Sequence, residues 1–160
     1  MKKIIYLSIA LSSLFFACNN GESELSCEEV LSKRLFEFDC SLSPVRVEVF
    51  NSPEELARFP GCEDLPAPEK YDCANTKFIE FMTENLRELP QNDMGNGSMI
   101  VTITIERDGC ISSVFIRDDY SCGCECIREG IRLVKSMPDW VPAIDGGVTV
   151  ASTKIFFIDF

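Results

Sequence analysis

The stretch Met99-Ile100-Val101-Thr102-Ile103-Thr104-Ile105-Glu106, followed by Arg107-Asp108-Gly109, decides the fold of this chain. Every second residue from Met99 to Ile105 is large and apolar, and this period of two predicts a β-strand with one buried face. The Asp-Gly pair supplies the positive φ angles of a tight hairpin turn. The chain then returns as a second strand over 111–117, so a β-hairpin is predicted at the centre of the protein.

A helix and a third strand are predicted after the hairpin. Ser121 is a candidate helix N-cap, because its hydroxyl can accept a hydrogen bond from a free N–H group of the first turn. The apolar side of this helix is predicted to comprise Cys124, Ile127, Ile131 and Val134. The turn at 145–147 then leads into a long strand from Val148 to Phe160.

Another helix is predicted before the hairpin. Its apolar stripe is Phe78, Met82, Leu86 and Leu89, with Asn75 or Thr76 as the N-cap and Pro90 as the stop. The stretch 58–71 contains three prolines and is predicted to be a loop. Trp140 is expected to close over the core rather than to contact a partner.

Two topological rules assemble these elements. Strands joined by a tight turn pair antiparallel, and strands joined through a helix run parallel with a right-handed crossover. Both rules hold when the first hairpin strand lies in the middle. We therefore predict an α+β fold with a small three-stranded antiparallel sheet of order 2-1-3, two helices on one face, and the strand 148–160 at an edge.

The N-terminus has the layout of a bacterial secretory leader. Two lysines precede an apolar run over 4–17, which is shorter than the roughly 20 residues that a membrane-spanning helix needs. A small residue before Cys18 resembles the lipobox of bacterial lipoproteins, which implies cleavage before Cys18 and lipidation of that cysteine. The alternatives are a transmembrane anchor and a soluble secreted protein in which Cys18 joins a disulfide.

Residues 1–17 are therefore expected to be a signal peptide, and 18–57 a tether with a short N-terminal extension. Within the extension, a helix is predicted between Cys27 and Cys40 and a strand over 45–50. The mature chain is expected in the periplasm, bound to a membrane by its lipid. Asn19 stands where some inner-membrane lipoproteins have an aspartate, which favours the outer membrane.

The cysteines predict disulfides, because an exported chain folds in an oxidising compartment. Beside Cys18, the candidates are Cys27, Cys40, Cys62, Cys73, Cys110, Cys122, Cys124 and Cys126. Spacing makes Cys27–Cys40 and Cys62–Cys73 the simplest pairs. Pairing Cys110 with the cluster at 122–126 strains the hairpin topology, so one of these four is free or is joined to Cys27, Cys40 or another chain. The cluster lacks the usual two-residue spacing of a metal site, and no metal or other cofactor is expected.

Charge and composition exclude several functions. Removal of the leader takes away two lysines and no acid, so the net charge falls from −11 to −13. So acidic a chain is expected to repel nucleic acid. There is no histidine, and the pairs at 28–29, 54–55 and 118–119 are expected to be solvated carboxylates rather than acid–base dyads. No enzymatic activity is expected.

From Arg58 to Phe160 the chain resembles the C-terminal domain of TonB, in the form common among Bacteroidota. The matching segments are Phe59-Pro60-Gly61-Cys62-Glu63, the helix from Phe78 to Leu86, the hairpin from Val101 to Ile111, the run Val134-Lys135-Ser136-Met137-Pro138-Asp139-Trp140-Val141-Pro142, and Gly147 with the closing strand. The resemblance implies that residues 58–160 are a binding module that adds an extended segment of an outer-membrane receptor to its sheet edge, as in TonB-dependent transport.

The resemblance places the peptide-binding edge in the last strand, at Val150, Ser152, Thr153, Lys154, Ile155, Phe156 and Phe157. The expected partner is a TonB-dependent receptor or another envelope protein. The chain departs from a full TonB in having a lipobox-like Cys18 in place of a transmembrane helix and no proline-rich spacer. The alternative is an envelope assembly lipoprotein that uses the same edge to form a homodimer.

Overall fold

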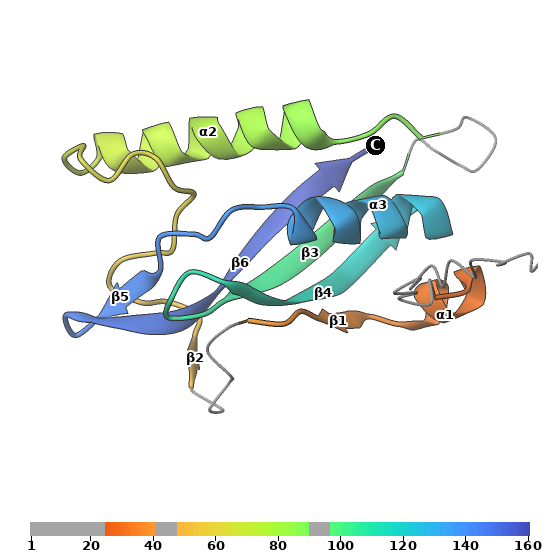
Figure 1. Ribbon diagram of the computed structural model, residues 1–160, viewed down its shortest axis with the longest axis horizontal. Helices are drawn as coiled ribbons and strands as arrows, with labels where there is room; N and C mark the ends of the chain where they lie inside the picture. Colours follow the sequence, from red (N-terminus) through yellow and green to blue (C-terminus); the bar gives the residue numbers. More distant parts are fainter. Residues whose placement is uncertain (1–24, 41–47, 90–96) are drawn as a thin grey trace, which may run out of the picture.

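The computed structural model describes residues 25–40, 48–89 and 97–160, and these form a mixed α+β fold (Figure 1). The predicted hairpin is strand β3 (Ser98–Ile105) with strand β4 (Ile111–Tyr120), and the last strand is β6 (Val148–Asp159). β3 lies between β4 and β6 and pairs antiparallel with both. The order of these three strands is therefore the predicted 2-1-3.

The sheet has six strands among the described residues, so the prediction of three strands was wrong. Strand β1 (Leu35–Glu37) pairs antiparallel with β4, and strand β2 (Val49–Phe50) pairs parallel with β6. Strand β5 (Ala143–Asp145) pairs with the first residues of β6. The three additional strands are short, and each lies beside an outer strand of the predicted sheet.

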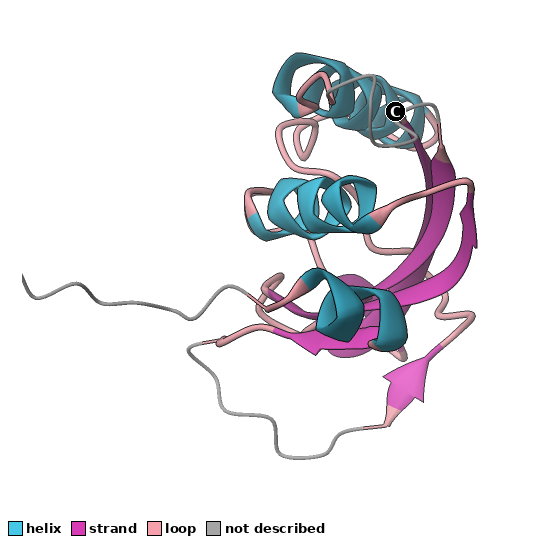
Figure 2. Cartoon of the chain, turned by 90° about the vertical axis from the view of Figure 1, so that its right-hand side faces the viewer, coloured by secondary structure: helices cyan, strands magenta, loops and turns pink. Residues whose placement is uncertain are grey.

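The hydrophobic core lies between the sheet and two helices. Helix α2 (Glu69–Asn85) and helix α3 (Cys124–Lys135) lie on the same side of the sheet (Figure 2). Met99, Val101 and Ile103 of β3 are fully buried beneath them, while Ile100 and Thr102 between them are half-buried on the other face. The period of two thus selects the buried face, because successive strand side chains point to opposite sides.

The helix boundaries differ from the predicted ones at both N-termini. α2 begins at Glu69, after Pro68, and not at Asn75 or Thr76. Proline is well tolerated there because the first N–H groups of a helix have no intrahelical partner. α3 begins after Gly123 rather than Ser121, which has a positive φ of 54°. The C-terminal end also differs: α2 ends at Asn85, so Leu86 and Leu89 lie beyond the helix and the predicted stop at Pro90 was wrong.

The N-terminal extension is a helix followed by a strand, not one helix up to Cys40. Helix α1 (Cys27–Ser32) begins with a capping box, in which Ser26 and Glu29 exchange hydrogen bonds. The chain then extends as β1 along the outer edge of β4. Of the predicted strand over 45–50, the first residues lie outside the described part and Val49–Phe50 form β2.

The extension explains the disulfides. Cys27 is joined to Cys124 and Cys40 to Cys110, so the predicted Cys27–Cys40 pair was wrong. An extended strand separates Cys27 from Cys40, and the β1–β4 register, continued past Glu37, places Cys40 opposite Cys110. The other two disulfides are Cys62–Cys73, which is the predicted local pair, and Cys122–Cys126.

The hairpin turn docks against the loop after α3. The backbone N–H of Trp140 donates to the Gly109 carbonyl at 2.9 Å, and a Cβ on Gly109 would collide with the Trp140 carbonyl oxygen. Gly109 also has a φ of +93°, which favours glycine. Trp140 is only 3% exposed and contacts the rings of Phe59 and Phe78, as expected for a core residue.

Candidate functional site

The edge of β6 is the site that the sequence singled out, and the structure divides it into two parts. Val148 to Val150 pair with β5, and Ala151 and Ser152 pair with β2. Val150 and Ser152 were therefore wrongly included in the free edge. Beyond Ser152, β6 pairs with β3 on one side, and no strand of the described residues pairs with the other side.

The direction of the backbone groups in this segment follows from one hydrogen bond. Phe160 N–H donates to the Gly97 carbonyl at 3.0 Å, so Phe160 faces β3. Pairing directions alternate along an antiparallel strand, and β6 pairs with β3 from 152 to 159 without a register shift. The residues facing β3 are Lys154, Phe156 and Ile158. The residues whose N–H and C=O groups face away from β3 are Thr153, Ile155, Phe157 and Asp159. The parallel register Phe50↔Ser152 directs Thr153 N–H at β2, so the free groups begin at the Thr153 carbonyl.

The side chains of this free edge segment, Thr153–Asp159, also alternate. Phe156 and Ile158 are buried on the helix side of the sheet. Ile155 and Phe157 are 48% and 64% exposed on the opposite face. The segment thus combines free backbone groups with exposed apolar side chains, a combination that favours pairing with another strand.

A second uncovered edge lies at the end of β4, and it differs in character. β1 pairs with β4 only over Ser113–Phe115, so Arg117 to Tyr120 extend beyond it. This stretch carries Arg117, Asp118 and Asp119, and the β3–β4 register shifts there. Charges and bulges are devices by which edge strands avoid pairing. The free edge segment of β6 is therefore the better candidate for binding a partner.

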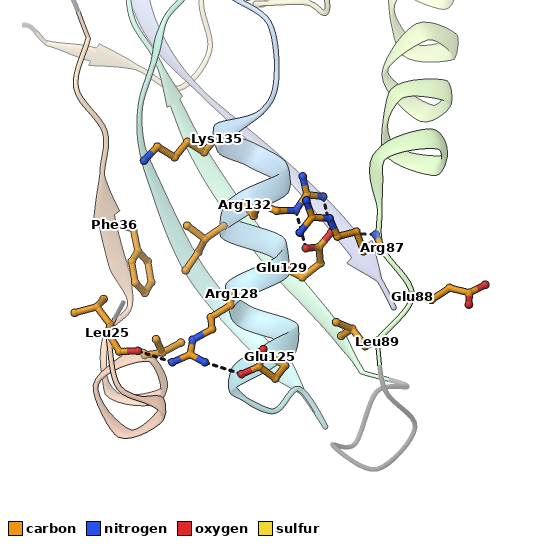
Figure 3. Close-up of a pocket in the computed structure, with 12 residues that line it drawn as sticks. Leu25, Phe36, Arg87, Glu88, Leu89, Glu125, Arg128, Glu129, Arg132 and Lys135 are labelled. Carbon is orange, nitrogen blue, oxygen red and sulfur yellow. Dashed lines mark hydrogen bonds and ion pairs between the residues drawn. The ribbon is translucent and has the colours of Figure 1, made fainter. Parts of the chain in front are cut away.

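A groove of about 550 Å³ lies between the N-terminal extension, α3 and the residues that follow α2 (Figure 3). Sequence reasoning did not find it, although Glu125, Arg128, Glu129 and Arg132 recur on α3 at the spacing of helical ion pairs. The groove is lined by apolar residues such as Phe36 and by these charged residues. Arg128 donates to Glu125 and to the Leu25 carbonyl, so it joins α3 to the start of the extension.

Glu129 is the buried charge of this groove. It is 6% exposed, and its carboxylate accepts hydrogen bonds from the Arg132 guanidinium and, at 3.0 Å, from the backbone N–H of Arg87. Burial acts to raise the pKa of Glu129, but the hydrogen bonds from Arg132 and Arg87 and their charges outweigh it, so the pKa lies below the usual glutamate value. The Glu129 carboxylate ties α3 to the segment after α2. We therefore interpret this groove as a structural junction.

Replacing Glu129 with glutamine is expected to destabilise the protein by about 1–3 kcal/mol at neutral pH, because Arg132 loses its charged partner. Since the folded-state pKa of Glu129 is lowered, its contribution is present above the unfolded-state pKa of about 4.3 and is lost as the pH falls through the folded-state value. Urea unfolding from pH 7 to pH 3 measures both effects. The deficit of Glu129→Gln should shrink at acid pH.

The matched control is Glu125→Gln on the same helix. Glu125 pairs with Arg128 three residues on, but 40% of its side chain is exposed. A surface ion pair contributes about 0–1 kcal/mol, so this variant should unfold close to the wild type. Equal losses for the two variants would contradict the role assigned to Glu129.

The remaining predicted site residues are placed as follows. Cys18 lies outside the described residues. The eight other cysteines form the four disulfides given above. Within 25–40, 48–89 and 97–160, no cluster of three or more histidine, cysteine or acidic residues is arranged to hold a metal ion. In the same ranges, no helix has the length and hydropathy required to cross a bilayer.

Comparisons with family models, with curated proteins and with solved structures found no match to this chain.

Proposed function

We propose that this chain is a non-enzymatic periplasmic lipoprotein that binds an extended segment of an outer-membrane receptor by strand addition, in the manner of the TonB C-terminal domain. The observation that carries the proposal is the free edge segment of β6, where the backbone groups of Ile155 and Phe157 face away from β3 and no described strand pairs with them. A peptide that pairs there gains main-chain hydrogen bonds, and its side chains meet Ile155 and Phe157 on the open face.

Partial coverage of β4 and of the start of β6 supports this choice. β1 lies along β4, and β2 and β5 occupy β6 only as far as Ser152. The TonB-like motifs and the lipobox-like sequence at Cys18 supply the class of partner and the compartment. The lipid would hold the binding module close to receptors of the same membrane, so no membrane-spanning helix is required for encounter.

Amide hydrogen exchange tests the proposal residue by residue. The amides of Ile155 and Phe157 should exchange quickly in the free chain, whereas those of Lys154 and Phe156, which face β3, should be protected. The partner is identified by capturing TonB-dependent receptors from solubilised outer membranes. Addition of the receptor segment that binds should then protect the amides of Ile155 and Phe157 selectively. Protection of these two amides in the dilute free chain, or no added protection in the complex, would contradict strand addition.

The same experiment separates the homodimer alternative. If a second copy of this chain pairs with the segment, protection of the Ile155 and Phe157 amides should rise with protein concentration in the absence of any receptor. The molar mass measured by light scattering should rise with it. A monomeric mass at every concentration would leave the receptor as the proposed partner.

A further inference from the structure

The open face of the sheet, which points away from α2 and α3, carries large apolar side chains (Figure 2). An antiparallel sheet with one solvated face normally places polar residues on that face. Here four large apolar residues stand on it, each between 45% and 64% exposed: Leu35, Phe115, Ile155 and Phe157. A contiguous apolar patch of this kind typically marks a surface that another molecule covers.

The strand register aligns these side chains in a row. Leu35 of β1 is opposite Phe115 of β4. Thr102 of β3 is opposite Phe115 on one side and opposite Ile155 of β6 on the other. Opposite residues of paired strands point to the same face, so this row crosses four strands over about 14 Å at the usual strand spacing. With the next row, these residues form what we call the apolar stripe: Leu35, Ile100, Thr102, Phe115, Ile155 and Phe157.

The occupant of a sheet face has to satisfy its own backbone groups. The N–H and C=O groups of a sheet lie in its plane, so a face offers a partner side chains but no backbone hydrogen bonds. A single extended strand laid on the apolar stripe would therefore bury unpaired backbone groups. A helix pairs these groups internally, and about ten helical residues span the length of the stripe. A helix is thus the simplest partner for this face.

The charge of the open face selects among helices. Three exposed acidic residues lie on it around the apolar stripe: Glu37, Asp118 and Asp159. Arg117, in the bulge next to Asp118, offsets one of them, so the face keeps an excess of negative charge in a chain whose net charge is −11. A second copy of the chain or an anionic lipid surface would bring like charges to this face. A helix with lysine or arginine beside its apolar side brings the opposite charge.

We propose that the open face binds a basic amphipathic helix of another protein, with the apolar side of that helix on the apolar stripe and its lysine or arginine side chains beside the three carboxylates. This inference goes beyond the proposed strand addition. A paired strand occupies the free edge segment in the plane of the sheet, whereas the helix covers the face. The two surfaces share only the side chains of Ile155 and Phe157.

The probes are two blocked peptides of about 15 residues with the same content of leucine, lysine and alanine. In the first peptide the leucines form one side of a helix, and in the second they are scattered around it. The full chain with its disulfides intact should bind the first peptide about tenfold more tightly, because only this peptide covers the apolar stripe with all its leucines. Binding should shift the methyl resonances of Leu35 and Ile155, which lie at the two ends of the row.

Phe115→Thr tests the centre of the apolar stripe. Phe115 is 45% exposed and threonine suits a strand, so the variant should stay folded. Its affinity for the first peptide should fall about tenfold, since central aromatic residues carry much of the binding energy of an interface. The matched control is Ile79→Thr, which removes an exposed apolar side chain of α2 and should leave the affinity unchanged.

Two double variants test the charges. Glu37→Gln with Asp118→Asn removes two carboxylates of the open face, and Glu80→Gln with Glu84→Gln removes two exposed carboxylates of α2. The first double variant should bind the first peptide several-fold more weakly, and the second should bind it as the wild type does. Equal losses would overturn the role of the open-face carboxylates, because they would reflect the net charge alone.

Other occupants of the open face are outcomes of the same experiment. Equal affinity for the two peptides, or no binding of either, would overturn the inference. The methyl resonances of Leu35 and Ile155 are also followed with vesicles of phosphatidylethanolamine and phosphatidylglycerol and with rising concentration of the protein alone. Shifts that appear only under these conditions would overturn it as well, because a membrane or a second copy would then cover the face.

Receptor capture separates this inference from the proposed function. Phe115 lies on β4, which β3 separates from β6, so Phe115→Thr should capture receptors as well as the wild type does. A chain that binds the first peptide but captures no receptor would support the helix site and count against strand addition. Receptor capture without binding of the peptide would do the reverse.

Discussion

Proline at position 155 is expected to abolish partner binding while the chain stays folded. Ile155 N–H faces the free side of β6, so proline removes no hydrogen bond to β3. Proline is tolerated at such positions of edge strands, and the side chain of Ile155 is 48% exposed, so the stability loss should stay near about 1 kcal/mol. Binding should fall more than tenfold, because the ring removes a donor and blocks the approaching strand.

Proline one residue further on should have the opposite effect. Phe156 N–H faces β3, so Phe156→Pro breaks the ladder in the middle of the sheet and also removes a buried ring. Loss of the ring alone is worth about 3–5 kcal/mol, and the broken ladder adds to it. Ile155→Ala and Phe156→Ala are the matched controls, because they separate the side-chain loss from the backbone effect.

Denaturant unfolding measures the stability of the two proline variants, and receptor capture measures their binding. Folded Ile155→Pro that captures receptors as well as the wild type would contradict strand addition at β6. Global unfolding of Ile155→Pro with a folded Phe156→Pro would show that the two backbone directions are the reverse of those assigned here.

Removal of the Cys27–Cys124 disulfide is expected to cost about 3–4 kcal/mol and to release the N-terminal extension. The two cysteines are 97 residues apart, but Cys40–Cys110 lies within that loop and shortens the part of the chain that the bond constrains. The chain-entropy relation for the shortened loop gives the stated magnitude. A double Cys→Ser variant keeps the other bridges and avoids an odd thiol.

Urea unfolding and hydrogen exchange measure this loss. Amides of α1 and β1 should lose protection in the Cys27/Cys124 double variant, because α1 contacts α3 next to this bridge. The control is the Cys62/Cys73 double variant, whose loop spans 11 residues and which lies at the start of α2. It should leave α1 and β1 protected. Unchanged protection of α1 in the first variant would contradict the anchoring role of Cys27–Cys124.

The elements predicted well are those whose information is local. The alternation in 99–105 and the Asp-Gly turn each depend on close neighbours in the chain. The apolar side of α3 was predicted only in part, because Ile127 and Val134 are buried whereas Cys124 and Ile131 are half-buried. The order 2-1-3 followed from general rules of connection. The close pair Cys62–Cys73 belongs to the same class, because few residues separate its partners.

The elements predicted wrongly depend on contacts between distant segments. Leu35 and Phe38 fit a helical spacing, but hydrogen bonds to β4 hold this stretch extended as β1. That strand in turn sets the pairs Cys27–Cys124 and Cys40–Cys110. The groove beside α3, with Glu129 joined to Arg87, also assembles from segments far apart in sequence. No local pattern carries such information.

The sequence by itself determined the class of the sheet, its central order, the buried face of β3 and the candidate segment in the last strand. Tertiary structure alone decided how much of that segment is free, because β5 and β2 occupy β6 through Ser152 and leave uncovered the part from the Thr153 carbonyl to Asp159. The physical reason is that backbone N–H and C=O groups are identical along every strand. Which of them stay unpaired depends on the strands that lie beside them, and not on the residues that carry them.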